Sequence, residues 1–322
     1  MKITTRPAEP GDARRFLEIA ARAFAAAPEH ARPKDRPEFV AHTHGPSNPS
    51  GGGWVTLAEE GGTFVGHVGA IPFRFRRGDG STIVGRQIGC YVVDGAHQGK
   101  GIGQAMLADQ MRTLARSEPD RFLYGYPNLK SLGPLLKQGG KEFARARTRL
   151  VLPARPGSRA TPIERIEAST ARQILESMPE PPAEQSSFVR DKAFFGWRFL
   201  AEPAAPRYAF AVSRRASGEP DLLLALAEHT ALGRKFTILV DVFPEVSSAR
   251  LGEAVLAARA AGGGKPVYAT TNDRWTRGPL SIAVPRRFDP RPVVGILMPV
   301  GREDVLAELA TAPIRTGDWM GF

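Results

Sequence analysis

The chain has 322 residues, of which 42% are hydrophobic and 24% are charged, and its formal net charge at pH 7 is +11. This composition provides an ample apolar core, and the length favours two domains over one. The sequence has no run of about 18 apolar residues that would predict a membrane-spanning helix, and its first residues lack the apolar region of a signal peptide, so we expect a cytoplasmic protein. The single cysteine, Cys90, excludes an internal disulfide.

The first part of the chain predicts strands and helices in alternation. Residues 2–6 are expected to form a strand, and residues 12–24 carry apolar side chains at helical spacing. Residues 54–58 and 63–76 alternate in polarity on either side of a Glu-Gly-Gly turn, which predicts a hairpin. A long strand is predicted from Ser81 onward.

The most informative stretch runs from Ile88 to Leu107, where a strand leads through a glycine-rich turn into an amphipathic helix. Gly99, Gly101 and Gly103 lack the Cβ atoms that would keep a ligand away from the backbone, and they allow the positive φ of a tight turn. The first amides of the helix have no intrahelical partner and lie at the positive end of the helix dipole. This arrangement predicts a phosphate-binding site.

The spacing of the turn does not fit two nucleotide-binding motifs. A P-loop requires a glycine at position 94 and Ser or Thr after Lys100, where this chain has Asp94 and Gly101. A dinucleotide fingerprint also fails, because its last glycine would fall on Gln104 or Met106.

The turn resembles the Gln/Arg-x-x-Gly-x-Gly/Ala signature of the GNAT N-acetyltransferase superfamily. In that family the turn holds the diphosphate of an acyl-coenzyme A, and the backbone of the preceding strand pairs with the pantetheine arm. The resemblance implies that acetyl-CoA is the co-substrate. The residues implied to bind it are Tyr91, Val92 and Val93 of the strand and Gln98, Gly99, Lys100, Gly101, Ile102 and Gly103 of the turn.

A second element that resembles the family follows a predicted strand at residues 122–126. Asn128 and Ser131 occupy positions at which the family contacts the coenzyme. Leu135 stands where the family has a tyrosine, the proposed acid that protonates the departing thiolate. Either the thiolate leaves unassisted, or another hydroxyl acts as the acid. Tyr126, at the end of the strand, is the candidate for that hydroxyl, and the alternative is that it is packed between a helix and the sheet.

The resemblance covers roughly residues 1–153. It implies an α+β GNAT fold, in which helices flank a mixed, mostly antiparallel sheet. The Pro-rich, apolar-poor residues 154–162 predict a linker. Residues 163–322 are expected to form a GNAT-like domain, because the order of their predicted elements resembles that of the first half. This domain is expected to be degenerate, since no Gly-x-Gly follows the predicted strand at 235–242. A phosphate could not approach the backbone there.

The second half of the chain also has predicted helices and an aromatic element. Residues 163–178 and 187–200 are predicted to contain helices. The aromatic element at 195–203 and the terminal Thr316-Gly317-Asp318-Trp319 resemble those of bacterial proteins with two such domains. The aromatic residues are expected to form the core of this half, and the alternative is that one of them lines the acceptor pocket. They are Phe194, Phe195, Trp197 and Phe199.

The resemblance implies an N-acetyltransferase that transfers an acetyl or other acyl group from acetyl-CoA to an amine of a small molecule or peptide. A neutral amine would attack the thioester carbonyl, a backbone N–H near Val92 would polarise that carbonyl, and coenzyme A would leave as the thiolate. The base that takes the proton of the amine is left open between Asp94, Asp318 and an ordered water.

Other classes of function receive less support. His42 and His44 lack a third ligand in the sequence, so no metal site is predicted. No nucleophile-elbow pentapeptide predicts a hydrolase. The positive charge is expected to attract the phosphates of coenzyme A rather than nucleic acid, because no basic and aromatic residues interleave. Two alternatives stay open: an acyl-CoA-binding sensor without turnover, and a nucleic-acid-associated protein.

Overall fold

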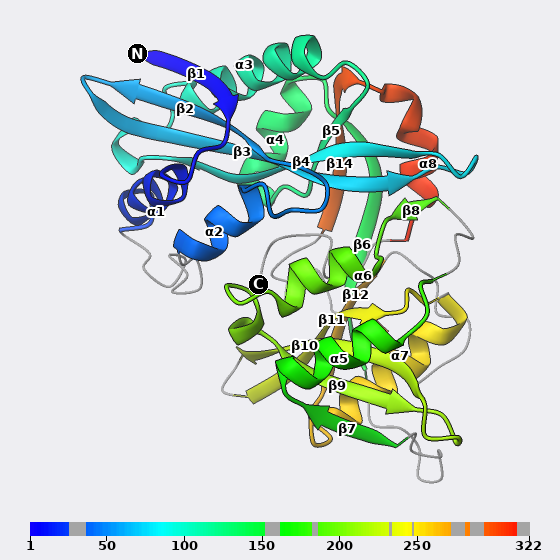
Figure 1. Ribbon diagram of the computed structural model, residues 1–322. Helices are drawn as coiled ribbons and strands as arrows, with labels where there is room; N and C mark the ends of the chain where they lie inside the picture. Colours follow the sequence, from blue (N-terminus) through cyan, green and yellow to red (C-terminus); the bar gives the residue numbers. More distant parts are fainter. Residues whose placement is uncertain are drawn as a thin grey trace. The chain divides into compact units, whose positions relative to one another are not determined.

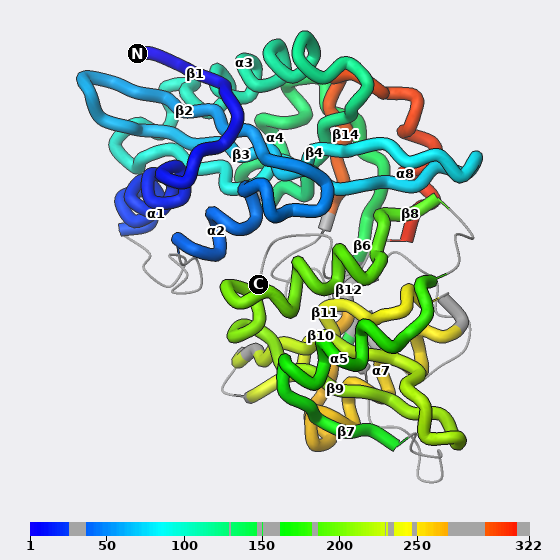
Figure 2. Tube along the Cα trace, in the orientation of Figure 1, coloured from blue at the N-terminus to red at the C-terminus, as the bar shows by residue number. Residues whose placement is uncertain are grey.

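The computed structural model describes residues 1–25, 37–151, 162–181, 186–231, 234–246, 248–271, 281–283 and 293–313. The chain forms two compact units (Figure 1). The first unit consists of residues 1–144, 185–189 and 294–312, and the second consists of residues 145–184, 190–293 and 313–322. The colours of Figure 2 show that the first unit combines the blue start of the chain with its red end.

The first unit contains a mixed, mostly antiparallel sheet with flanking helices. Its strands lie in the order β1-β2-β3-β4-β5-β14-β6, and β4 and β5 form a parallel pair. The strands are β1 (Lys2–Pro7), β2 (Trp54–Glu60), β3 (Thr63–Arg76), β4 (Thr82–Val93), β5 (Phe122–Gly125), the start of β6 (Lys141–Val151) and β14 (Val293–Gly301), and the short β8 (Ser187–Phe188) pairs with β3. The helices are α1 (Asp12–Ala23), α2 (Pro37–His44), α3 (Ile102–Ser117), α4 (Leu129–Lys137) and α8 (Leu306–Thr311), with short 3-10 turns η1 (Gly95–His97) and η4 (Glu303–Val305).

These elements confirm the predicted α+β class with a mixed sheet. The predicted first strand, the helix that follows it, the hairpin and the long strand after it correspond to β1, α1, β2–β3 and β4. The sheet separates two apolar clusters. One contains Met106 and Leu107 of α3, and the other contains Phe16 and Ile19 of α1.

β14 comes from the far end of the chain and lies between β5 and β6. Its residues Ile296, Met298 and Val300 are buried in the same cluster as α3. The core behind the glycine turn therefore depends on a strand some 190 residues further along the sequence than the turn itself, since β14 begins at Val293 and α3 at Ile102. Nothing in the local sequence pattern predicts this pairing.

The second unit repeats the strand order of the first. Its order is β7-β9-β10-β11-β12-β6, with β13 also paired to β6. In each unit a helix connects a parallel pair of strands, β4 and β5 or β11 and β12. A strand from a distant part of the chain lies beside the later strand of each pair. The strands are β7 (Ile163–Ile166), β9 (Ala209–Arg214), β10 (Pro220–Ala231), β11 (Arg234–Phe243), β12 (Val267–Thr271) and β13 (Ser281–Ala283). The helices are α5 (Ala168–Ser177), α6 (Lys192–Phe195) and α7 (Ser248–Ala261), with a π-helical turn η2 (Gly196–Leu200) and a 3-10 turn η3 (Ala205–Arg207).

Two expectations for the second half need correction. Residues 163–166 form the strand β7 rather than the start of a helix, because they pair with β9, and α5 begins only at Ala168. Residues 187–188 form β8 and not helix, because they pair with β3. Tertiary pairing overrides the local pattern in both cases.

The aromatic residues of the second half form part of its core, as expected. Phe194, Phe195, Trp197 and Phe199 are all less than 9% exposed. The predicted domain boundaries at 153 and 163 stay a prediction, and most of the predicted linker lies outside the described residues.

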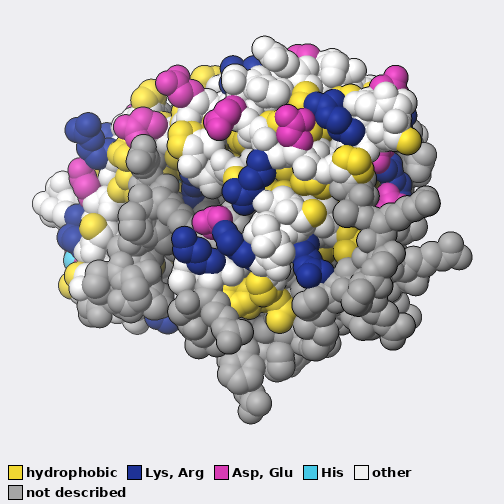
Figure 3. All heavy atoms as spheres, turned by 90° about the horizontal axis from the view of Figure 1, so that it is seen from below, with side chains coloured by type: hydrophobic (Ala, Val, Ile, Leu, Met, Phe, Trp, Pro, Cys, Tyr) yellow, Lys and Arg dark blue, Asp and Glu magenta, His cyan; other side chains and the backbone are white. Residues whose placement is uncertain are grey.

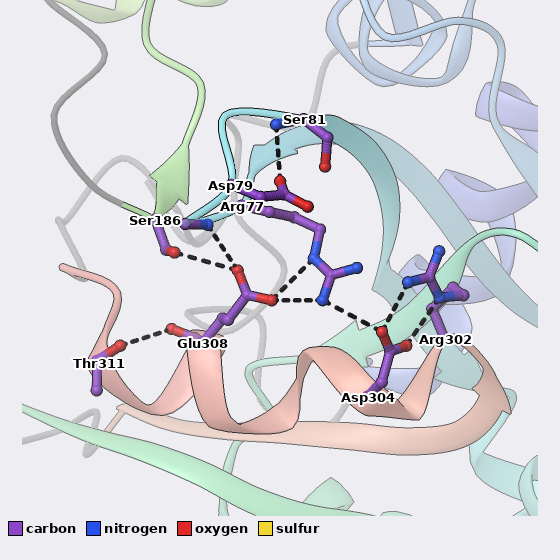
Figure 4. A network of polar contacts seen from close by, with 9 residues as sticks. Arg77, Asp79, Ser81, Ser186, Arg302, Asp304, Glu308 and Thr311 are labelled. Carbon is purple, nitrogen blue, oxygen red and sulfur yellow. Dashed lines mark hydrogen bonds and ion pairs between the residues drawn. The ribbon is translucent and has the colours of Figure 1, made fainter.

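A cluster of ion pairs joins α8 to the turn between β3 and β4 in the first unit (Figure 4). Glu308 accepts hydrogen bonds from Arg77 Nε at 2.8 Å, from the amide of Gly78 at 2.9 Å and from Ser186 Oγ at 3.1 Å. Arg77 also lies 3.2 Å from Asp304. Burial alone would raise the pKa of Glu308, but the bonds from Arg77, Gly78 and Ser186 outweigh it and lower the pKa.

We predict that Ile296→Ala lowers the free energy of unfolding by about 2–5 kcal/mol, because the buried side chain would leave a cavity. Urea unfolding followed by circular dichroism measures this change. Leu136→Ala is the control: Leu136 is 47% exposed, so the expected change is within about 0.5 kcal/mol. Equal effects of the two substitutions would contradict a core position for β14.

We also predict a pH-dependent effect of Glu308→Gln. Because the folded-state pKa of Glu308 is lowered, its stabilising effect is present above the pKa of an unfolded glutamate, about 4.3, and is lost as the pH falls through the folded value. At pH 7 the variant should be less stable by about 1 kcal/mol, since both side chains of the main pair are partly exposed. The difference should vanish in acid. Glu219→Gln, in an exposed pair, is the control, and at pH 7 it should change the free energy of unfolding by less than about 0.5 kcal/mol in the same urea titrations.

Candidate functional site

The strands β4 and β5 part in the middle of the first sheet. They pair from Gly85 and Phe122 to Ile88 and Gly125, where β5 ends. β4 continues for five residues, to Val93. Over these residues no described strand pairs with the edge that β5 has left, and we name this stretch the open edge of β4.

A β-bulge lies within this stretch. Cys90 and Tyr91 of β4 lie opposite the single residue Val68 of β3, because the register shifts between His67 and Gly69. Cys90 has a φ of +50° and is the one non-glycine residue in the described part of the chain with a positive φ. The bulge therefore gives the backbone a conformation that a regular strand does not have.

The bulge also reverses the alternation of side chains. Ile88 packs in the cluster of α3, whereas Val92, four residues later, packs in the cluster of α1. In a regular strand these two side chains would lie on the same face. The side chains of Tyr91 and Val93 are partly buried in the cluster of α3.

Backbone groups of Val93 point to the open edge. The amide of Asp94 donates to the carbonyl of Val65 on β3 at 2.9 Å, and the direction of backbone groups alternates along a strand. Gln98 Nε2 donates to the carbonyl of Val93 at 3.0 Å, which agrees with this direction. Gln98 thus ties the predicted turn to the end of the open edge.

The glycine turn has the backbone that a phosphate site requires. Gly99 and Gly101 have φ of +79° and +78°, and a Cβ on either would meet no described atom within 4 Å. Gly101 is the N-cap of α3, and no side chain of the described residues caps this helix. Its first N–H groups, at the positive end of the helix dipole, are therefore open to an anion. Lys100, beside them, is exposed.

Gly103 is required for a different reason. A Cβ at this position would lie 2.4 Å from the hydroxyl of Tyr91. The strand and the first turn of α3 are therefore in close contact. The structure brings together all nine predicted residues of the strand and the turn in one continuous strand–turn–helix unit.

Asn128 and Ser131 lie at the start of α4, after β5. Asn128 is the N-cap of α4, and its Oδ1 accepts hydrogen bonds from the amides of Lys130 and Ser131 and from Ser131 Oγ, each at 3.0 Å. Because β4 and β5 are parallel, the turn after β4 and the cap after β5 lie at the same end of the sheet. The cap accounts for Asn128 structurally, and coenzyme contact by either residue stays a prediction.

Tyr126 and Leu135 occupy apolar surroundings. Leu135 is 1% exposed and belongs to the cluster of α3. The ring of Tyr126 lies edge-on to Tyr124 at 5.8 Å and to Phe143 at 6.1 Å between ring centroids. These contacts fit the packing alternative, and a catalytic role of Tyr126 stays a prediction.

Asp94 is poorly suited to act as a base. Its carboxylate accepts hydrogen bonds from Arg22 Nε and, at 3.0 Å, from the amide of Ala96. The bond from Arg22, followed by weaker contributions from Ala96 and His97, lowers the pKa of Asp94. A carboxylate with a lowered pKa takes up a proton less readily. Asp318 lies outside the described residues.

Two buried histidines, His44 and His67, do not belong to any sequence motif that predicts a binding or catalytic residue. His44 and His67 are 5% and 1% exposed, and both belong to elements of the first unit. His44 is the last residue of α2, and His67 lies on β3 opposite Val92. Only the tertiary structure shows that they lie beside the bulge.

The described residues contain no group of three His, Cys, Asp or Glu that could hold a metal ion. None of the described helices is both long and apolar enough to cross a membrane. On the face shown in Figure 3, Lys and Arg side chains are interspersed with Asp and Glu among the coloured atoms.

Residues 4–140 match the family model described as "Acetyltransferase (GNAT) domain". The first part of the chain is therefore a GNAT domain, as the motifs predicted. No curated protein matches the sequence.

Solved structures of similar fold include several acyltransferases. A GCN5-related N-acetyltransferase from Anabaena variabilis has a TM-score of 0.61 at 11% identity, over 92% of this chain and 72% of that one. A probable N-acyltransferase from Enterococcus faecalis has a TM-score of 0.58 at 13% identity, over 96% and 75%. N-myristoyltransferase from Saccharomyces cerevisiae, with bound myristoyl-CoA, has a TM-score of 0.56 at 11% identity, over 92% and 79%. At these identities the likeness is one of fold alone.

Proposed function

We propose that the protein is an N-acyltransferase that transfers an acetyl or other acyl group from acyl-CoA to an amine of a small molecule or peptide. The observation that carries this proposal is the open edge of β4, which leads directly into the uncapped N-terminus of α3. The open edge of β4 presents strand-like backbone groups, and the N-terminus of α3 presents unpaired amides. An acyl-CoA has a matching amide-containing arm and a diphosphate.

Different residues would bind different parts of the coenzyme. The amides from Gln98 to Gly103 would hold the diphosphate, with Lys100 adding positive charge. The backbone of residues 91–93 would pair with the pantetheine arm. Asn128 and Ser131 would approach the coenzyme from the neighbouring strand end. These roles agree with the open space at Gly99 and Gly101.

The reaction is a direct transfer. The lone pair of a neutral amine forms the new C–N bond at the thioester carbon, and the C–S bond breaks as coenzyme A leaves as a thiolate. The proton of the amine passes to a base that is not Asp94, in view of its bonds to Arg22 and Ala96. Holding both reactants together supplies part of the rate, and a backbone N–H at the carbonyl oxygen supplies more.

The second unit is proposed to be a GNAT-like copy that does not bind coenzyme A. It repeats the strand order of the first unit, but the segment between β11 and α7 begins with Pro244 and contains no glycine. We therefore expect one coenzyme A per chain in a calorimetric titration. Two equivalent sites would contradict this proposal.

A sensor without turnover is the second candidate function. It is favoured by Leu135, which leaves the usual position of the acid tyrosine to a buried aliphatic side chain. Release of free coenzyme A thiol from acetyl-CoA, measured against a panel of amines, separates the two candidates. A sensor would bind acetyl-CoA but release no thiol above the background rate.

Gly101→Val is predicted to weaken coenzyme A binding severely, by about tenfold or more. The branched side chain resists the positive φ and occupies the space in front of the helix N-terminus. Gly80→Val is a matched control, because Gly80 has a φ of +84° and equally open surroundings at the hairpin turn between β3 and β4. Both variants should lose similar stability, and only the first should lose affinity in calorimetry.

Tyr126→Phe tests the candidate acid, because it removes the hydroxyl alone. A catalytic role predicts a fall in turnover of about 100-fold or more with the affinity for coenzyme A unchanged. Steady-state kinetics and calorimetry on the same preparation measure the two quantities. Turnover within a few-fold of the parent protein would make Tyr126 a packing residue and would favour unassisted departure of the thiolate.

A further inference from the structure

A buried histidine is hydrogen-bonded to the bulge of β4. The Nδ1 atom of His67 lies 3.0 Å from the carbonyl oxygen of Cys90, and the His67 side chain is almost wholly buried. A carbonyl oxygen can only accept a hydrogen bond, so Nδ1 carries the proton and donates. Burial, and to a lesser extent the neighbouring His44, lower the pKa of His67 to about 4, so the ring is neutral at pH 7.

Neighbouring side chains fix the position of this ring. The ring of Phe16 on α1 lies 5.2 Å from it, and the ring of His44 on α2 lies 6.2 Å from it in an edge-to-face arrangement. His44 is itself held by a hydrogen bond of 3.0 Å between its Nδ1 and the carbonyl of Val40. A Cβ at Gly69 would lie 2.3 Å from His44 Nε2, so the ring of His44 is packed closely against the backbone of β3.

The hydrogen bond to Cys90 sets the direction of the next amide. The peptide bond between Cys90 and Tyr91 is trans, since the one cis peptide bond in the described part of the chain precedes Pro244. In a planar trans peptide, the C=O and the following N–H point in opposite directions. The carbonyl of Cys90 points to the ring of His67, which packs against α1 and α2, so the N–H of Tyr91 points away from that ring.

A second contact gives the direction of this N–H relative to the edges of the strand. Two residues beyond Tyr91, the carbonyl of Val93 points to the open edge and accepts the hydrogen bond from Gln98. Backbone groups of residues two apart in a strand point to the same side. The N–H of Tyr91 is therefore a donor at the place where the strands part.

We propose that His67 is a positioning residue: through the carbonyl of Cys90 it aims the N–H of Tyr91 at the carbonyl oxygen of the bound acyl thioester. This inference rests on the proposed acyl transfer. As the amine forms the C–N bond, the electron pair of the C=O bond moves to oxygen, and the N–H of Tyr91 stabilises the negative charge. The pair then re-forms the C=O bond as the thiolate leaves. His67 gains and loses no proton, and its hydrogen bond makes the same peptide group a stronger donor.

Two variants of similar size test this role. His67→Asn retains an N–H at the same number of bonds from the backbone as Nδ1, whereas His67→Leu has no donor. We expect His67→Leu to lower kcat by about 10- to 100-fold, with the affinity for free coenzyme A within about twofold of the parent value. His67→Asn should recover most of the loss. An unchanged kcat in His67→Leu, or equal losses in both variants, would overturn the inference.

A spectroscopic measurement separates positioning from simple loss of structure. In acetyl-CoA labelled with carbon-13 at the carbonyl, the C=O stretch should move to lower frequency on binding, since a hydrogen bond weakens this bond. His67→Leu should reduce that shift, and His67→Asn should keep it. If the parent protein bound acetyl-CoA with no shift, this inference alone would be wrong. If it bound no acetyl-CoA at all, the proposed function would fail as well.

The parent protein offers a test that does not depend on the folding of any variant. In protein labelled with nitrogen-15 in histidine, the Nδ1–H signal of His67 should move on addition of acetyl-CoA and much less on addition of coenzyme A, which has no acyl carbonyl. Equal responses to the two ligands would contradict the inference.

Discussion

The parting of β4 and β5 is the constraint on which the proposed site depends. Two strands that separate leave backbone donors and acceptors without their ladder partners, and such groups are costly unless something else bonds to them. On the open edge of β4, Gln98 bonds to the carbonyl of Val93, while His67 bonds to the carbonyl of Cys90, which points away from this edge. Both of these contacts use acceptors. The N–H groups on the open edge remain for a ligand with carbonyl oxygens, and an acyl pantetheine chain has such oxygens.

The rigidity of this opening comes from distant parts of the chain. β14 lies next to β5 and buries Ile296 and Met298 against the helix that follows the glycine turn. On the other face, α1 and α2 bring Phe16 and His44 against His67. An open edge set between two packed layers can keep its geometry without a partner strand. Proximity effects in catalysis require a site that holds its geometry in this way.

Local signals predicted the turn well, and non-local contacts account for what the sequence did not predict. Gly99 and Gly101 are required by a left-handed backbone that few other residues adopt, so their spacing alone predicts the turn. The insertion of β14 depends on a pairing across most of the chain, for which no periodicity exists. His67 stands in an apolar strand and shows its partner, Cys90, only once the bulge is formed. The helix predicted from residue 163 failed in its first residues for the same reason, because pairing with β9 outweighs local propensity.

The second unit also has a β-bulge in the strand that pairs with β12, but charged side chains lie beside it. β11 carries a bulge near the same point, since Val240 is the extra residue between Leu239 and Asp241 in its pairing with β10. Beside this bulge stands Asp241, whose buried carboxylate accepts a hydrogen bond from the amide of Val242 and lies 3.4 Å from Arg190. This carboxylate is held in an ion pair with a buried arginine, whereas the His67 ring beside the bulge of β4 is neutral at pH 7. The second unit thus differs from the first in lacking a glycine turn after β11 and in having an ion pair beside its bulge, which supports the proposal of a single centre of acyl transfer in the first unit.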